Sequence, residues 1–342
     1  MMRRLLTIAS LTVLTTLPSP FVQELAAQGQ GQGQGQRPRP EQRRGDDRPS
    51  QSEKISRTLN LGADGEIHIA NISGDIVVTR NSGNSVALEI VKTARAGTDA
   101  EAKEALSFVN VEVVERGTLA EIRARYPGFE NRRGDRRGMR VDVAMRIAAP
   151  AGTRITVKSI SGDITVSDIA GALALETVSG SVRLSNTGRL ATAKSISGDI
   201  EMADSKADGA LSAGSVSGTI RLRGVTARTL SLSTVSGNVN VEDVTSERVD
   251  AQAISGNVAF MGNLAPNGRY EFTSHSGNVR IAVDGKTGFQ LEATSFSGGI
   301  SSDLPISAEG GKQPRSLRGK FGDGSATLEL TSFSGSISIT RR

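Results

Sequence analysis

The sequence predicts an all-β protein built as a parallel β-solenoid, in which each repeat winds once around a flattened tube. Three observations predict this fold. A Ser-Gly dipeptide recurs along the chain, most copies follow one another after 18–21 residues, and apolar and polar residues alternate on both sides of each copy. Alternation with a period of two is typical of strands with one buried and one exposed face. Each repeat therefore supplies two short strands that meet at Ser-Gly.

The Ser-Gly pairs are expected to form the corners of about ten coils, because glycine can adopt a positive φ at a corner. Successive coils would stack like residues about 4.8 Å apart, giving a thin aliphatic core and a ladder of serine hydroxyls. The pairs are Ser73 and Gly74, Ser161 and Gly162, Ser179 and Gly180, Ser197 and Gly198, Ser217 and Gly218, Ser236 and Gly237, Ser255 and Gly256, Ser276 and Gly277, Ser297 and Gly298, and Ser334 and Gly335.

A second topology would also explain the alternation. An antiparallel meander could turn at each Ser-Gly through a two-residue hairpin. From Ser161 the steps between serines are 18, 18, 20, 19, 19, 21 and 21 residues, and then 37, roughly two periods. A constant period with the same residue class in each column favours the solenoid, because stacking in register requires it and a meander does not.

Two segments interrupt the repeats. Residues 80–152 contain several extended segments and a short helical pattern that starts at Thr98, a suitable N-cap. We expect an inserted β-rich cap with one short helix, because the end of a solenoid exposes unpaired strand edges. Residues 303–324 hold two Pro and several Gly, and are expected to form a loop insertion in place of a coil. The adhesin-like domain would then span residues 53–342.

The N-terminal region reads as an export signal followed by a tether. Two Arg precede a short apolar stretch from Leu5 to Leu17, and small residues stand before Gln28. Residues 1–27 are therefore predicted to be a signal peptide. Residues 28–52, rich in Gln, Gly, Pro and Arg, have the composition of a disordered linker. The protein is expected to be exported (periplasmic, cell-envelope-associated or secreted), with no transmembrane segment after cleavage.

Composition argues against several function classes. The chain has no Cys and only 2 His, so no cofactor or metal site is expected. The net charge of +5 comes mainly from the N-terminal tail and one Arg-rich loop, which gives no groove for nucleic acid. That loop could touch anionic lipid or glycan, or be a solvated loop without a partner. Its arginines are Arg132, Arg133, Arg136, Arg137 and Arg140.

Catalysis is not expected either. The many serines lack the Gly-x-Ser-x-Gly elbow and its His and Asp partners. A polysaccharide-active solenoid would need paired carboxylates, but the outward acids are scattered over different columns. Asp163 and Asp199 fall two coils apart, roughly 10 Å, just beyond the usual range for an inverting pair. A carbohydrate-active enzyme is therefore the least favoured class.

The repeats resemble a known family. Residues 159–166 (SISGDITV), residues 195–200 (SISGDI) and the Ala-Pro-Ala-Gly step at 149–152 are similar to the bacterial putative-adhesin domain family of unknown function. The resemblance covers roughly residues 55–342. It implies export, a β-solenoid and an adhesin-like role, with no catalytic residues to transfer.

The function expected on these grounds is a non-enzymatic binding or structural module of the cell envelope. Its partner would be an envelope polymer or glycan. Family relatives in Gram-positive bacteria are associated with envelope stress, which implies an alternative role as a signalling partner that docks a membrane regulatory protein.

Overall fold

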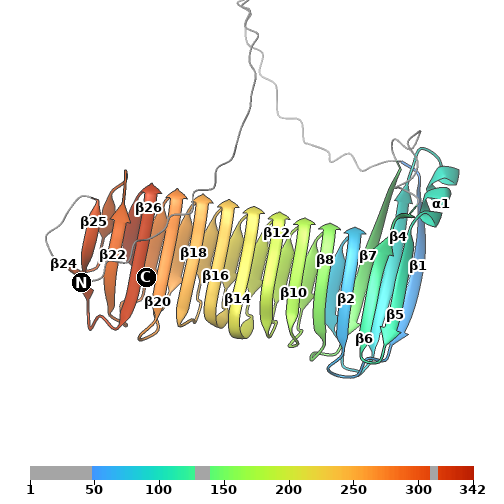
Figure 1. Ribbon diagram of the computed structural model, residues 1–342, viewed down its shortest axis with the longest axis horizontal. Coiled ribbons are helices and arrows are strands. Elements are labelled where there is room, and N and C mark those ends of the chain that lie inside the picture. Colours follow the sequence, from blue (N-terminus) through green and yellow to red (C-terminus); the bar gives the residue numbers. More distant parts are fainter. Residues whose placement is uncertain (1–47, 128–138, 309–314) are drawn as a thin grey trace, which may run out of the picture. The chain divides into compact units, whose positions relative to one another are not determined.

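The computed structural model describes residues 48–127, 139–308 and 315–342. The predicted signal peptide and most of the predicted linker lie outside the described residues. The described chain forms two large sheets, whose strands lie side by side (Figure 1). Its first strand begins at Ser50, so the last three residues of the predicted linker pair with a neighbouring strand instead.

Each sheet takes one strand from almost every repeat. The first sheet contains, in spatial order, β24 (Ser307–Ala308), β25 (Ser316–Phe321), β22 (Phe289–Ser295), β26 (Ala326–Ser334), β20 (Arg269–Ser276), β18 (Arg248–Ser255), β16 (Thr226–Ser236), β14 (Lys206–Ser217), β12 (Leu190–Ser197), β10 (Leu173–Ser179), β8 (Arg154–Ser161), β2 (Glu66–Ser73), β6 (Leu119–Arg125) and β5 (Asn110–Arg116). The second contains β1 (Ser50–Leu59), β4 (Val86–Arg95), β7 (Arg140–Ala149), β3 (Ile76–Arg80), β9 (Ile164–Ser167), β11 (Val182–Ser185), β13 (Ile200–Ala203), β15 (Ile220–Arg223), β17 (Val239–Glu242), β19 (Val258–Gly262), β21 (Val279–Val283), β27 (Ile337–Arg341) and β23 (Ile300–Ser302).

The pairing of the strands decides between the two topologies. The strands on either side of a Ser-Gly belong to different sheets, and each pairs in parallel with the equivalent strand of the next coil. Ser161 lies opposite Ser179, and Ser179 opposite Ser197. The predicted all-β parallel solenoid is therefore confirmed, and the antiparallel meander is wrong.

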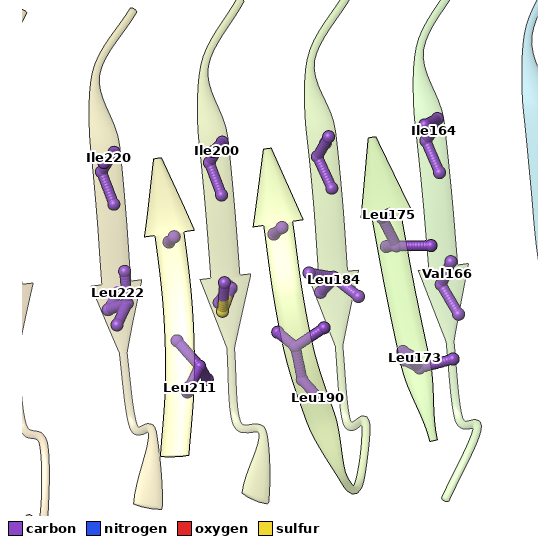
Figure 2. Close-up of a cluster of buried hydrophobic side chains, with 14 of the residues drawn as sticks. Ile164, Val166, Leu173, Leu175, Leu184, Leu190, Ile200, Leu211, Ile220 and Leu222 are labelled. Carbon is purple, nitrogen blue, oxygen red and sulfur yellow. The ribbon is translucent and has the colours of Figure 1, made fainter. Parts of the chain in front are cut away.

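The core is a narrow seam between the two sheets (Figure 2). Ile164 and Val166 of β9 face Leu173 and Leu175 of β10, and all four are at most 1% exposed. Alternation places every second residue of each strand in this seam. Each buried Leu or Ile contributes about 1.5–3 kcal/mol, so the many shallow coils together supply the stability that aromatic residues give to thicker cores.

The N-terminal end is closed by the inserted segment. β7 joins the second sheet parallel to β3, and β4 and β1 then extend it in antiparallel fashion, while β6 and β5 extend the first sheet. Helix α1 (Asp99–Ser107) contacts β1 and β4 (Figure 1). Its N-cap Thr98 forms a capping box with Glu101. The expected β-rich insertion with one short helix is confirmed.

The C-terminal end departs from the expected order. β26 pairs with both β20 and β22, so the last repeat in the sequence lies between the two repeats that precede it. The predicted loop over residues 303–324 contains β24 and β25, and β25 pairs antiparallel with β22. The segment expected to be a long loop therefore holds two strands, because the outer edge of β22 needs a partner for its backbone groups.

Candidate functional site: a ridge of exposed side chains at the coil corners

The ten Ser-Gly pairs lie at one corner of the coils, where the chain passes from the first sheet to the second. The N–H of Gly180 donates to the carbonyl of Ser197 in the next coil at 3.0 Å, and the N–H of Gly162 donates to Ser179 at 2.9 Å. At Gly180 φ is +150°, and a Cβ there would lie 2.1 Å from the carbonyl oxygen of Gly162. The corner therefore requires glycine because adjacent coils approach closely.

Side-chain hydroxyl groups also form hydrogen bonds at this corner. They belong to a column that was not predicted as a site from the sequence. It lies two residues before each Ser-Gly serine. Ser195 donates to the carbonyl of Gly180 at 3.0 Å, and Ser274 donates to that of Gly256 at 2.8 Å. These side chains are 4% and 1% exposed. The Ser-Gly serines themselves are partly or fully exposed, and among them Ser73 donates to a carboxylate oxygen of Asp142 at 2.6 Å.

Between these two columns lies a row of exposed, mostly apolar side chains, which we call the corner ridge. It consists of the residue just before each Ser-Gly serine. Side chains of this kind are normally buried, yet each of the nine apolar members is 37–62% exposed. In spatial order the ridge is Ile72, Ile160, Val178, Ile196, Val216, Val235, Ile254, His275, Phe333 and Phe296.

The ridge ends in a stack of three rings. The rings of His275 and Phe333 are 4.7 Å apart and nearly parallel, and Phe333 stacks on Phe296 at the same distance. This order follows from the placement of β26 between β20 and β22. The 4.7 Å between rings is the spacing of adjacent strands in a sheet, so the ridge repeats at the period of the coils.

A groove runs along the first-sheet side of the ridge. Its volume is about 630 Å³, and its walls include Val178, Ile196, Val216 and Val235. Its floor is opened at Gly214, which has no side chain in a column that elsewhere carries residues such as Lys and Gln. The groove therefore lies next to the middle of the ridge.

The carboxylates considered for catalysis serve the structure. Asp163 accepts a hydrogen bond from the backbone N–H of Ser181 at 2.8 Å and pairs with Arg183 at 2.6 Å. Burial opposes ionisation of Asp163, but these hydrogen bonds together hold its pKa below its ordinary value. Asp199 is placed in the same way by Thr219 and Arg221, and its pKa is also lowered against the effect of burial. Both groups are ionised and engaged at neutral pH.

A row of acids on the outer face of the first sheet was missed by the sequence analysis. Glu329 of β26 lies in register between Glu271 and Glu292, and Asp250 is the next neighbour of Glu271. Partial burial raises the pKa of Glu271, and the charges of Glu329 and Asp250 raise it further. All four acids stand five residues before a Ser-Gly serine, so the sequence places them in one column, and the structure adds that Glu329 lies between Glu271 and Glu292.

The two His and Arg140 are the remaining residues considered for a functional role. His68 contacts Glu66 at 2.6 Å, far along the stack from His275. Within residues 48–127, 139–308 and 315–342 there is no group of three His, Asp or Glu placed to hold a metal ion. Arg140 begins β7 and pairs with Asp142 at 3.0 Å.

The other four arginines of the Arg-rich loop (Arg132, Arg133, Arg136 and Arg137) lie outside the described residues, so their suggested contact with anionic lipid or glycan stays a prediction. Among the residues that the structure describes, no helix is long and apolar enough to span a bilayer.

A match to a family model identifies the family of this chain. The family model described as Toastrack DUF4097 matches residues 48–229 and 211–340, almost all of the described chain. The protein belongs to the Toastrack family. This confirms the predicted membership of a bacterial putative-adhesin family of unknown function, and an uncharacterised binding module fits this family.

Solved structures of low identity are also similar to this chain. A putative lipid binding protein from Parabacteroides distasonis is 13% identical over 84% of this chain and 96% of its own, with a TM-score of 0.46. A putative adhesin from Bacteroides fragilis is 14% identical over 85% and 97%, with a TM-score of 0.40. A putative adhesin from Parabacteroides merdae is 12% identical over 87% and 98%, also with a TM-score of 0.40. No curated protein matches the sequence. Membership of the family therefore rests on the family model.

Proposed function

We propose that this protein is an exported, non-enzymatic binding module of the cell envelope, and that it holds another macromolecule against its corner ridge. The observation that carries the proposal is the ridge itself. Nine large apolar side chains, each 37–62% exposed, lie along the coils, with His275 between Ile254 and Phe333. Together they expose on the order of 600 Å² of apolar surface, at the upper end of the patches found on monomeric proteins.

Stability alone does not account for these side chains. The core lies between the sheets, and the corner is held by the glycine backbone and by the buried hydroxyls. Threonine or serine on the ridge would allow the same backbone bonds. Contiguous exposed apolar surface on an exported chain supports a role in binding.

The groove supports the same role. It provides a concave wall beside a protruding row, with Lys158, Glu176 and Lys194 at its border. An apolar centre with a polar border is the usual composition of a contact surface. The carboxylates considered for catalysis are engaged in structural pairs, which supports a binding role over an enzymatic one.

The proposal is tested by cell fractionation and co-sedimentation. The full chain is expected in the envelope or secreted fraction, and the purified protein is expected to sediment with envelope preparations. Replacing Ile196 and Val235 together by Lys should reduce this retention more than tenfold, because two charges would have to be desolvated on contact. Thr226→Lys is the matched control, since Thr226 is exposed at the opposite end of β16.

Equal retention of all three proteins would contradict the proposal, and so would a cytoplasmic location of the full chain. Cleavage of an envelope polysaccharide by the pure protein would contradict its non-enzymatic part.

A further inference from the structure

The molecule that covers the ridge can be inferred from the spacing of the ridge. Its side chains repeat at the distance between stacked strands, and the ring stack shows this distance directly as 4.7 Å. Side chains from another surface can fit between them along the whole row only if that surface repeats at the same distance. Strands stacked in register provide this repeat, as in the dry interdigitated contacts between paired sheets.

We propose that the occupant is a second copy of this chain, which lies against the first ridge to ridge. This inference takes the ridge as contact surface from the proposed function and names its partner. Ten coils give a ridge of roughly 40 Å. The ridge exposes on the order of 600 Å² of apolar surface. The polar side chains beside the ridge that also line the groove, among them Lys158, Glu176 and Lys194, add to this area, and one partner in a stable interface buries roughly 800 Å².

The two copies run in opposite directions. A twofold axis parallel to the stack would place each ridge side chain tip to tip with its own counterpart. A twofold axis perpendicular to the stack lets one row shift by half a coil, so that the side chains interdigitate.

The groove fits this arrangement. In an antiparallel pair the axis passes near the middle of the ridge, between Val216 and Val235. The groove lies beside these coils, and Gly214 leaves room in it. The second copy's Val235 would therefore enter the groove near Gly214. Ile72 at one end of the ridge would meet the ring of the second copy's Phe296.

Sedimentation velocity of the purified full chain over a range of concentrations tests the association. The wild-type protein is expected to form a dimer at micromolar concentration. Val216→Lys should weaken association about a hundredfold or more, because it places a charge at the centre of the contact. Thr226→Lys should leave association unchanged. Circular dichroism and thermal unfolding check that both variants keep the wild-type fold, as an exposed position predicts.

Cross-linking tests the direction. The chain has no Cys, so each introduced Cys is unique. Val216→Cys lies near the axis and should give a cross-linked dimer with a short bismaleimide. Phe296→Cys alone should not, but it should cross-link when mixed with Ile72→Cys. A parallel pair would instead join Phe296→Cys to itself and overturn the arrangement.

Two further outcomes would overturn the inference. One is a wild-type protein that stays monomeric at all concentrations, and the other is a dimer that Val216→Lys does not weaken. If the protein is monomeric but the ridge variants lose envelope retention, the proposed function stands and the occupant is a different molecule, such as a lipid surface or an amphipathic helix. If the dimer behaves as expected while the ridge variants retain envelope binding, the ridge is a self-association surface and the proposed function fails.

Discussion

The middle of the stack and its two ends obtain the same contacts in different ways. From β8 to β20 the order of the coils in space is their order in the sequence, and each coil repeats the contacts of the one before it. At the N-terminal end β7 takes the place of a coil, and at the C-terminal end β26 lies between β20 and β22. A repeated sequence is therefore sufficient to form these contacts where both neighbouring coils are repeats. At the two ends of the stack, residues that differ from the repeat are needed to form them.

The first coil shows what such a residue does. Where most coils have a Ser or Thr two residues before Ser-Gly, this coil has Asn71, which is 3% exposed. Its amide nitrogen donates to the carbonyls of Gly74 and Val143, both at 2.9 Å. Val143 belongs to β7, which is antiparallel to β4 and has no Ser-Gly corner. The longer amide reaches a carbonyl that a hydroxyl would not reach.

The largest effect is expected from glycine at a corner in the middle of the stack. Gly180→Ala would bring a Cβ to 2.1 Å from the carbonyl oxygen of Gly162, at a φ of +150°. Because the clash is with the backbone of the preceding coil, which is held in register, we expect a loss of about 3 kcal/mol in the free energy of unfolding. Chemical denaturation measures this loss.

Gly299 is the control at the end of the stack. A Cβ there has no atom within 4 Å, so Gly299→Ala should change stability by less than about 0.5 kcal/mol. Equal effects of the two substitutions would mean that the close approach of the coils is not what requires glycine.

The second effect concerns Asn71. Asn71→Ser should cost about 2 kcal/mol, because the buried carbonyl of Val143 loses its donor and a small cavity remains. The same serine is native in the middle of the stack, at Ser195. Thermal and chemical unfolding of the variant measure the cost. A loss close to zero would show that the end of the stack accepts the same residues as the middle.

The sequence predicted what every coil repeats and failed where a single coil differs. Columns of Ile, Val and Ser-Gly specified two strands per coil and stacking in register, because a period of two assigns each residue to one face. The position of β26 could not be predicted, because chain order says nothing about which of two similar coils lies nearer. The spatial order of Glu271, Glu329 and Glu292 could not be predicted for the same reason, although all three stand five residues before a Ser-Gly serine.

The corner ridge was visible in the sequence but was not predicted as a site. Ile, Val or Phe stands before almost every Ser-Gly, out of phase with the buried positions on either side. Apolar residues at a position that alternation assigns to the exterior were the available signal. The hydroxyl ladder was predicted at the Ser-Gly serines. The hydroxyls that form buried hydrogen bonds lie two residues before them.

A third, smaller effect on stability is expected in the hydroxyl column, where two members differ in their hydrogen bonds. Ser274 donates to Gly256, whereas the hydroxyl of Thr177 is buried without a hydrogen-bond partner in the described structure. Ser274→Ala should cost about 1 kcal/mol, since it leaves a carbonyl without its hydroxyl donor. Thr177→Val keeps the shape of the side chain and removes an unsatisfied hydroxyl, so stability should stay the same or rise. If both variants lose the same stability, the hydroxyl of Thr177 has a partner in solution.

The smallest effect is the pH dependence that Asp163 contributes. The pKa of its carboxyl is below its ordinary value of 3.8 in the folded protein, so its stabilising effect is present above that pH and is lost as the pH falls through the folded pKa. Asp163→Asn keeps an oxygen that can accept from Ser181, as Asn238 does for Asn257, but loses the charge opposite Arg183. The pair is exposed, so we expect a loss of about 0.5 kcal/mol at pH 7 and a smaller loss at a pH well below 3.8. Urea unfolding at the two pH values measures the difference. A loss of the same size at both would assign the effect to the hydrogen bond from Ser181 and not to the ion pair.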